Sequence, residues 1–507
     1  MNSKAKGIII CVVVAICLGA MLLVLKFIPK ADSGSSSSDT GIIESNDDTG
    51  SISLTDSVAE TLDKTNVKSV VFHNKNGEFE IVQTSVGGEE WKIEELEGIN
   101  QNQMMYSSVA NTLCSLAAKD IVEEDTNDLS KYGLEEVSSF FTVTFHYDGK
   151  DKQKTFLIGD ESPESGYYYV CEAGSTKIYT VYASNLSYFL YSKEDFISLS
   201  MLPAMPSDAD ESYFTSLKVT QKSKDYDIIF ENAPEGTASM VSAQVMTSPI
   251  FSYLDVTNSS AVTHGMWGLT AQRAVVAKPG AADFKKYGFD NPNAAAVLKC
   301  KDGEYTLKIG NCEYVKDSEG DNTETVDGYY AYLEGVDGID VIFYCSADDM
   351  PWAVFNPSDV ISGLMTTNNV VDVKDVKVKT ADIDITYDLT VSEENEEGNK
   401  TVEKVLENSK TKIDPEVWKG WYQLLIQCPT TEIYFTDPES KTADITIDID
   451  LSEGGGDKME FYKQTDRRYI VKLNGKTSFR IESGWVDAII GGIEKVRNGE
   501  EVNADTY

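Results

Sequence analysis

Few residues of this chain have the types and spacing that catalysis requires. Ser409 and Lys412 have the spacing of a serine nucleophile and its lysine base, but the stretch is polar and no K-T-G segment accompanies it. Residues 475–477 (Gly-Lys-Thr) resemble the end of a phosphate-binding loop, yet Ile470 stands where the first glycine belongs. No G-x-S-x-G segment occurs, and acidic pairs are too frequent to single out a glycosidase dyad. The sequence therefore predicts no catalytic residue and no cofactor-binding residue.

Residue types that bind metals also lack the spacing that a site needs. His73, His146 and His264 fall in separate predicted elements, and no two cysteines form a C-x-x-C pair. The acidic loop at 317–324 lacks the alternating oxygen ligands and the sixth-position glycine of an EF-hand. We therefore expect no metal site.

Six cysteines lie outside the N-terminal apolar stretch and could pair as disulfides. They are dispersed singly within apolar stretches, which favours buried free thiols over disulfides. These cysteines are Cys114, Cys171, Cys300, Cys312, Cys345 and Cys428.

The clearest pattern in the chain is a set of three dipeptide landmarks that occurs twice in the same order. The first set is Tyr132-Gly133, Ile158-Gly159 and Gly166-Tyr167, and the second is Tyr287-Gly288, Ile309-Gly310 and Gly328-Tyr329. Glycine at a strand end often permits a positive φ or a bulge, and a neighbouring tyrosine packs with its hydroxyl at the edge. We therefore interpret these twelve residues as a structural repeat motif.

The elements around the landmarks predict a β-rich unit with one or two packed helices. In the first unit a hairpin with an Asn-Gly turn at 76–77 precedes a helical stretch at 101–118, and alternating strands follow. The second unit repeats the strands and places a helix within 243–263. A more divergent third unit lacks the Tyr-Gly landmark, but has a helix at 416–428 and an alternating strand at 445–451.

The N-terminal stretch at 7–25 carries no charge and is long enough to cross a bilayer as a helix. A cleaved signal peptide would need a shorter apolar region and a small-residue site, and a lipoprotein would need a small residue where Ile16 precedes Cys17. We therefore expect an uncleaved anchor, with the N-terminus cytoplasmic and the bulk of the chain extracellular. This orientation relies on an excess of positive charge on the cytoplasmic side, and that excess is small because lysines lie at both ends of the stretch.

The predicted fold class is α+β, an N-terminal transmembrane helix followed by tandem, mainly antiparallel units. The expected boundaries are 1–30 for the cytoplasmic tail and anchor, 31–57 for a flexible Ser/Gly/Asp-rich linker, and 58–205, 206–365 and 366–507 for the three repeat units.

The charge of the chain bears on its partners. With 83 acidic and 44 basic residues the net charge is −39. A surface this acidic repels phosphates, because nucleic-acid binding depends on Lys and Arg to neutralise them. We expect the lipid bilayer, through residues 7–25, to be a partner and nucleic acid not to be one.

Several of these segments together resemble a bacterial family, the domain of unknown function 4340. The resemblance rests on a Trp-x-Ile strand at 91–93, the helix after it, and the segments at 131–134, 156–159 and 166–170, with residues 287–292 and 309–310 in the second unit. It implies tandem copies of this domain and a relation to accessory proteins of gliding-motility-type ABC transporters. The family supplies no catalytic residues.

The resemblance implies a non-enzymatic, membrane-anchored extracytoplasmic accessory or scaffold protein, associated with an ABC-type transport or cell-envelope system. Its expected protein partners are integral membrane transporter subunits. The alternative is a cell-surface binding module for glycan or peptide ligands, which would use clustered aromatics at 167–169, 329–330 and 418–422. A hydrolase, the third option, would need a convergent pocket of perturbed acids.

Overall fold

The computed structural model describes residues 52–54, 56–57, 60–85, 87–234, 241–316, 324–394, 399–430 and 432–502. The predicted anchor at 7–25 and most of the predicted linker lie outside these residues. Within them, no helix combines the length and the apolar character needed to cross a bilayer. The architecture of the described residues is α+β, with three large antiparallel sheets and six α-helices.

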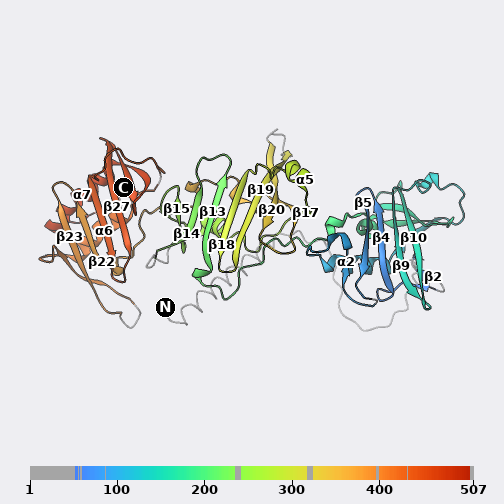
Figure 1. The fold of residues 1–507 in the computed structure, drawn as a ribbon. Coiled ribbons are helices and arrows are strands. Elements are labelled where there is room, and N and C mark those ends of the chain that lie inside the picture. Colours follow the sequence, from blue (N-terminus) through green and yellow to red (C-terminus); the bar gives the residue numbers. More distant parts are fainter. Residues whose placement is uncertain are drawn as a thin grey trace, which may run out of the picture. The chain divides into compact units, whose positions relative to one another are not determined.

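The first sheet has eight strands in one antiparallel layer (Figure 1). In spatial order they are β6 (Trp91–Lys92), β5 (Gly77–Gln83), β4 (Val67–Asn74), β9 (Ser139–Tyr147), β10 (Lys150–Glu161), β11 (Tyr167–Glu172), β12 (Ile178–Tyr182) and β8 (Asp120–Glu123). The helices of this region are α2 (Gln103–Cys114) and α3 (Ala183–Leu186), with 3-10 turns η1 (Glu94–Leu96), η2 (Ser130–Tyr132), η3 (Ser187–Leu190) and η4 (Lys193–Phe196).

The second sheet has nine strands. Their order is β16 (Ser252–Tyr253), β15 (Gln244–Ser248), β14 (Ile228–Asn232), β13 (Phe214–Gln221), β18 (Ala294–Cys300), β19 (Gly303–Lys316), β20 (Glu324–Glu334), β21 (Val341–Ser346) and β17 (Arg273–Ala277). Its helices are α4 (Val256–Thr263) and α5 (Ala281–Tyr287), with 3-10 turns η5 (Glu211–Tyr213), η6 (Pro351–Ala353) and η7 (Pro357–Asp359).

The third sheet again has eight strands. Their order is β25 (Thr411–Ile413), β24 (Val402–Glu407), β23 (Asp384–Val391), β22 (Val373–Lys379), β26 (Ile445–Leu451), β27 (Gly456–Thr465), β28 (Arg468–Leu473) and β29 (Lys476–Glu482). It is preceded by the 3-10 turn η8 (Val370–Asp372) and accompanied by α6 (Pro415–Ile426) and α7 (Ser483–Asn498).

The three sheets share one order of strand pairing. Each begins with a hairpin, namely β4–β5, β13–β14 or β22–β23, whose first strand then pairs with the first strand of a four-stranded meander. A helix lies between the hairpin and the meander in the chain: α2, α4 or α6. In the first two sheets the segment after this helix adds an edge strand, β8 or β17, beside the last meander strand.

The third sheet has a shorter version of this edge. After α6, Ile433 forms an isolated antiparallel bridge with Phe479 of β29. The backbone N–H of Tyr434 donates to the carbonyl oxygen of Ser478, and that of Arg480 donates to Glu432. The edge position beside the last meander strand is therefore occupied in all three sheets.

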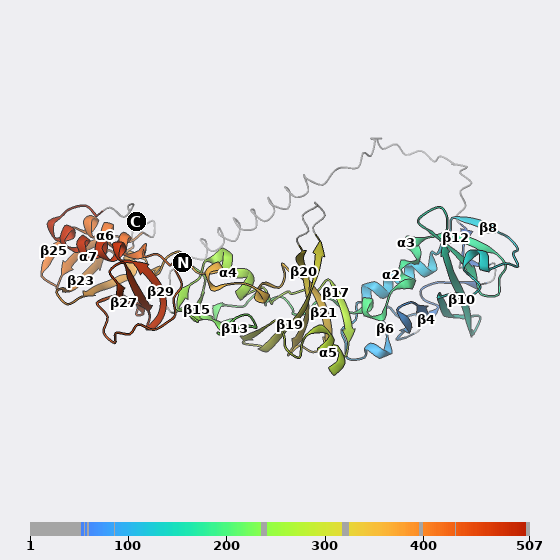
Figure 2. The same cartoon turned by 90° about the horizontal axis from the view of Figure 1, so that it is seen from above.

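The third sheet is covered on one face by two amphipathic helices. Figure 2 shows α6 and α7 side by side over its strands. Asp414 caps the start of α6, since its side chain accepts from the N–H of Glu416, and Pro415 occupies the first turn, where a missing N–H costs nothing. The indole N–H of Trp421 donates to the carbonyl oxygen of Ile489 at 2.9 Å, which joins the two helices within the core.

Two glutamines close the β6 edge of the first sheet. The side-chain amide of Gln103 accepts from the N–H of Trp91 at 3.1 Å and donates to its carbonyl oxygen at 2.9 Å. Gln101 accepts from the N–H of Ile93 at 2.9 Å and donates to the carbonyl oxygen of Leu96 at 3.2 Å. The two amides thus take the place of another strand's peptide groups.

Two short strand pairs begin within the expected linker at 31–57. In the first, β1 (Ile52–Ser53) pairs with β7 (Ala117–Ala118), and in the second, β2 (Asp56–Ser57) pairs with β3 (Glu60–Thr61). The helix predicted at 101–118 is shorter than expected: it ends at Cys114, because β7 follows it and pairs with β1. The helix expected within 243–263 is confirmed as α4, and β15 forms the first part of that range.

Candidate functional site

The Tyr-Gly and Ile-Gly landmarks of the first sheet lie against each other. Tyr132 ends η2, and Gly133 follows it with a φ of 66°, a left-handed conformation that favours glycine. Gly159 lies in β10, and its Cα faces the carbonyl oxygen of Tyr132 directly because glycine has no side chain. A Cβ there would clash with that oxygen and would lie 2.9 Å from Cγ of Leu134. The two glycines therefore allow the η2 turn to rest on the sheet.

The second sheet repeats this contact. Tyr287 ends α5, and Gly288 follows it with a φ of 87°. A Cβ on Gly310 of β19 would clash with the Tyr287 carbonyl oxygen and would lie 3.2 Å from the ring of Phe289. Tyr-Gly and Ile-Gly recur together because they are the two sides of one backbone contact.

Each contact supports a small hydrophobic cluster that is separate from the main core. Tyr132 packs edge-on against Tyr169 with ring centroids 4.9 Å apart, and Tyr287 packs against Tyr330 at 4.5 Å. The ammonium group of the preceding lysine lies over each landmark tyrosine, at 4.9 Å from the ring in the first sheet and 4.7 Å in the second.

The third landmark does not match in register. Ile158 pairs with Val170 and Ile309 pairs with Ala331, and both strand pairs have a bulge just beyond these positions. Gly166 therefore lies one place outside the position equivalent to Gly328.

The two glycines of the third landmark also differ in local role. Gly166 precedes β11 with a φ of 90°, whereas Gly328 lies inside β20, where a Cβ would clash with the carbonyl oxygen of Cys345. The neighbouring tyrosines differ as well, since Tyr329 is buried and Tyr167 is half-buried. Gly166-Tyr167 and Gly328-Tyr329 are therefore alike in sequence but have different structural roles.

Ion pairs lie beside the short edge of the third sheet, next to β29. Glu432 lies between Arg480 and Arg468, with a distance of 2.9 Å to Nη1 of Arg468. The hydrogen bonds from Arg480 lower the pKa of the Glu432 carboxyl. The guanidinium of Arg480 also lies 5.1 Å from the ring centre of Tyr434. This arrangement occupies the edge without a Tyr-Gly landmark.

The predicted aromatic surface is mostly interior. Trp418, Trp421 and Tyr422 are buried between α6 and the third sheet, and Tyr329 is buried in the second. Tyr167, Tyr168 and Tyr169 are half-buried. These clusters therefore contribute mainly to packing.

The histidines lie apart in the structure. His73 lies beside Glu78, and His146 lies beside Asp151. His264 is packed against Phe214 and Trp267, and burial lowers its pKa. Among the described residues, no three His, Cys, Asp or Glu side chains converge in a way that could hold a metal ion.

The remaining chemical candidates have structural partners. The Ser409 hydroxyl donates to Asp388 at 2.8 Å, and Gly475 has a φ of 81° in the turn between β28 and β29. The six cysteines of the described residues are free thiols. Burial raises the pKa of Cys171 to about 11 and of Cys345 to about 12.

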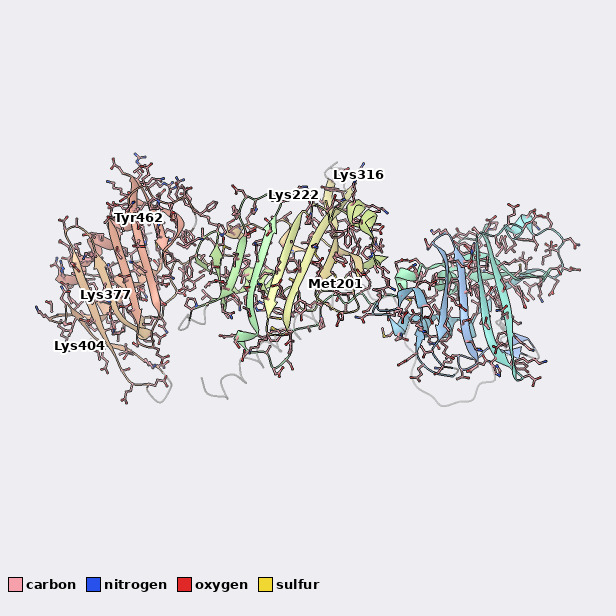
Figure 3. All side chains as sticks on the ribbon, viewed as in Figure 1. Met201, Lys222, Lys316, Lys377, Lys404 and Tyr462 are labelled. Carbon is pink, nitrogen blue, oxygen red and sulfur yellow. The ribbon has the colours of Figure 1, made fainter. Side chains whose placement is uncertain are left out.

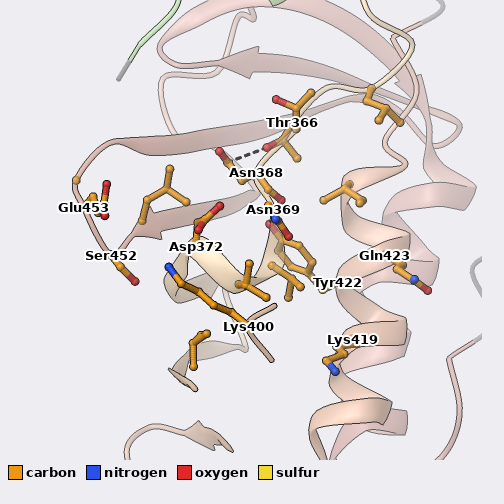
Figure 4. Close-up of a pocket in the computed structure, with 18 of the residues that line it drawn as sticks. Thr366, Asn368, Asn369, Asp372, Lys400, Lys419, Tyr422, Gln423, Ser452 and Glu453 are labelled. Atoms are coloured by element: carbon orange, nitrogen blue, oxygen red, sulfur yellow. Dashed lines mark hydrogen bonds between the residues drawn. The ribbon is translucent and has the colours of Figure 1, made fainter. Parts of the chain in front are cut away.

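A pocket of about 760 Å³ lies beside α6 and is here called the α6 pocket. Its walls come from α6, the segment 364–372, the end of β23 with Lys400, and the turn at 451–454. Figure 4 shows Lys419 and Gln423 of α6 on one side and Ser452 and Glu453 on the opposite side. Such a volume is typical of ligand pockets.

One wall of the α6 pocket is held by a buried carboxylate. Asp457 is 2% exposed and accepts hydrogen bonds from Tyr253 at 2.8 Å, Asn474 at 2.8 Å, Asn368 at 2.9 Å and the Thr366 hydroxyl. These five residues, here called the Asp457 cluster, come from the second sheet, the connecting segment and the third sheet. Four hydrogen-bond donors offset the cost of removing a carboxylate from water.

Asp457 is not among the residues that the sequence patterns predicted. The pattern that could have found it is strand alternation, since Asp457 points to the same face as Met459 and Phe461, which are both buried. A charged residue in phase with core residues indicates a buried polar contact.

Residues 91–249 match a family described as a domain of unknown function (DUF4340). The chain contains one such region. A comparison with curated proteins found no match. A comparison with solved structures found none either.

The DUF4340 region does not coincide with a single sheet. It begins at β6, includes α2 and the first pair of landmarks, and ends beyond β15 in the second sheet. The hairpin β4–β5 precedes it, and the landmarks of the second sheet follow it. The α6 pocket lies wholly outside the DUF4340 region.

Proposed function

We propose that this protein is a non-enzymatic, membrane-anchored extracytoplasmic accessory protein that binds subunits of a transport or cell-envelope system. Residues 7–25 would anchor it as a single-pass helix with the bulk of the chain outside the cell. The observation that carries the proposal is the shared strand order of the three sheets, which is typical of proteins that present repeated modules for binding.

We also propose that the three sheets are tandem copies of one DUF4340-like unit. Support comes from the common pairing order and from the glycine contacts at Tyr132 and Tyr287, which have the same geometry. In the third unit, which lacks the landmark, Glu432 and Arg480 pair beside the short edge.

Hydrogen bonds also join the sheets to the segments next to them. Met201 donates its N–H to the carbonyl oxygen of Leu269 at 2.9 Å, and its sulfur lies 3.6 Å from that of Cys345. Between the second and third sheets, the backbone N–H of Phe251 donates to the Ser478 hydroxyl at 3.0 Å.

The test is co-purification. Tagged full-length protein is extracted from its native cells in mild detergent, and bound proteins are identified by mass spectrometry against an anchor-only control of residues 1–57. Enrichment of integral membrane transport subunits is the expected result. Protein that elutes alone and monodisperse would contradict the proposal. Protease treatment of intact cells tests the orientation, since residues after 60 should be cleaved.

A second candidate is a surface binding module for glycan or peptide ligands. The α6 pocket favours the peptide form of this candidate, because its size and mixed lining suit a peptide ligand. This candidate predicts a ligand-dependent rise in melting temperature of the full-length protein, which a scaffold without a ligand site would not show.

A further inference from the structure

One wall of the α6 pocket is held in place by hydrogen bonds within the chain itself. The hydroxyl of Tyr422 donates to the Asn368 carbonyl oxygen at 2.8 Å, and the Asn368 side chain donates to both Thr366 and Asp457 (Figure 4). These bonds hold the segment 364–372 against α6. A preformed wall binds a ligand without the entropy cost of ordering it.

The lining combines three kinds of chemistry. Aliphatic side chains that are half-buried form part of the wall: Leu364, Val370, Val371, Val391 and Ile426. Side chains with amide or hydroxyl groups form another part: Asn369, Ser392, Gln423 and Ser452. Charges of both signs complete it: Lys400, Lys419, Asp372 and Glu453.

This combination argues against a sugar and against a simple ion. Tyr422, the aromatic residue of the described lining, is 2% exposed and its hydroxyl is already used, so it offers no ring face for stacking. Two lysines and two acids leave the pocket without the excess of one sign that a phosphate or a cation would require.

A polypeptide segment fits all three parts of the lining. Its apolar side chains suit the aliphatic wall, its peptide groups suit the amides and hydroxyls, and side chains of either charge meet an opposite partner. Thr367, also in the lining, is 3% exposed, and its hydroxyl has no hydrogen-bond partner within the described part of the chain. This hydroxyl is itself buried, so it contributes to the wall and not to the surface that a peptide would contact.

We infer that the α6 pocket binds an extended segment of a partner polypeptide, with apolar side chains against Val371 and Ile426 and charged groups near Lys419 and Glu453. This inference rests on the proposed function, since it names where one of the protein partners docks. It places that docking site outside the DUF4340 region.

The test uses the full-length protein in its native cells. Gln423 is replaced by photoreactive p-benzoylphenylalanine, and cross-linked products are mapped by mass spectrometry. The matched control carries the same group at Lys404, which is exposed on the third sheet but outside the pocket lining (Figure 3). We expect the Gln423 position, but not the Lys404 position, to cross-link to one contiguous stretch of another polypeptide.

Two further variants block the pocket in the Gln423 cross-linking background. Val371→Trp fills the aliphatic wall, and Ser452→Trp covers the opposite side from an exposed position that leaves the core untouched. Each should lower the cross-link about tenfold, whereas Lys404→Trp should not. Melting temperatures of all variants verify that they are folded.

Three results would overturn the inference: a cross-link to glycan or lipid, a cross-link that persists in both blocked variants, or no product above the Lys404 control. Co-purification is run on the same variants. If membrane subunits still co-purify while no pocket cross-link forms, the accessory proposal stands and the pocket inference fails. If nothing co-purifies either, both fail.

Discussion

Gly159 lies directly against the carbonyl oxygen of Tyr132, and its missing side chain is what lets the η2 turn rest on β10. Gly310 and Tyr287 repeat this relationship in the second sheet. The contact explains a sequence pattern in which two glycines separated along the chain recur together.

Substitution of these glycines should therefore destabilise the sheets locally. Gly159→Ala and Gly310→Ala each force a Cβ against a carbonyl oxygen, which should cost about 1–3 kcal/mol by overpacking. Gly363→Ala is the matched control, because a Cβ there would meet no atom within 4 Å. Amide hydrogen exchange should show faster opening confined to the sheet that carries the substitution; unchanged protection would contradict the contact.

The Asp457 cluster should be sensitive to loss of charge. Asp457→Asn retains the shape but replaces one acceptor oxygen with a donor, so at least one buried donor among the four loses its acceptor. We expect a loss of about 1–3 kcal/mol of local stability. This loss is measured as faster hydrogen exchange of the backbone amides of residues 364–372. The exchange rates of the first sheet should stay the same. Equal protection in variant and parent would contradict the role of Asp457.

His264 should make the second sheet sensitive to acid. Burial against aromatic rings lowers its pKa below the ordinary 6.5, so the folded state favours the neutral ring. The stability that this neutral ring contributes is full above pH 6.5 and is lost as pH falls through the lower folded pKa.

The measurement is hydrogen exchange of α4, corrected for the intrinsic effect of pH on exchange. Protection of α4 should fall in mildly acidic buffer, and His264→Gln should remove that pH dependence. A pH dependence that survives in His264→Gln would assign the effect to other groups.

The cysteines should react in an order set by burial. Burial raises the pKa of Cys345 from the ordinary 9.0 to about 12, so its thiolate fraction at neutral pH falls on the order of a thousandfold. Maleimide labelling of the folded protein should modify the half-exposed Cys300 and Cys312 first and Cys345 and Cys428 only after unfolding. The mass of the labelled, unfolded chain then counts the free thiols, and any missing label would indicate a disulfide.

The elements with strong periodicity could be predicted from the sequence. Ile445–Leu451 alternates apolar and polar residues and forms β26, and the apolar face around Trp418 and Trp421 forms α6. The helix α5 was not predicted, because Ala281–Tyr287 is only seven residues long, too short for helical periodicity to stand out.

The candidate site could not be predicted in the same way. The four partners of Asp457 come from three places in the chain, and only the register of β27 and the course of the connecting segment bring them together. The mismatch of Gly166 and Gly328 has the same origin, since the number of residues in a loop sets the register of the strand that follows.

The amides of Gln101 and Gln103 have a consequence for the chain while it folds. An open strand edge invites another unfolded or partly folded copy to pair with it, which is a route to aggregation. Because these side chains already satisfy the backbone of Trp91 and Ile93, a second copy cannot extend the first sheet from this side without first displacing them. The β6 edge of the first sheet is therefore protected against growth into a larger β-assembly.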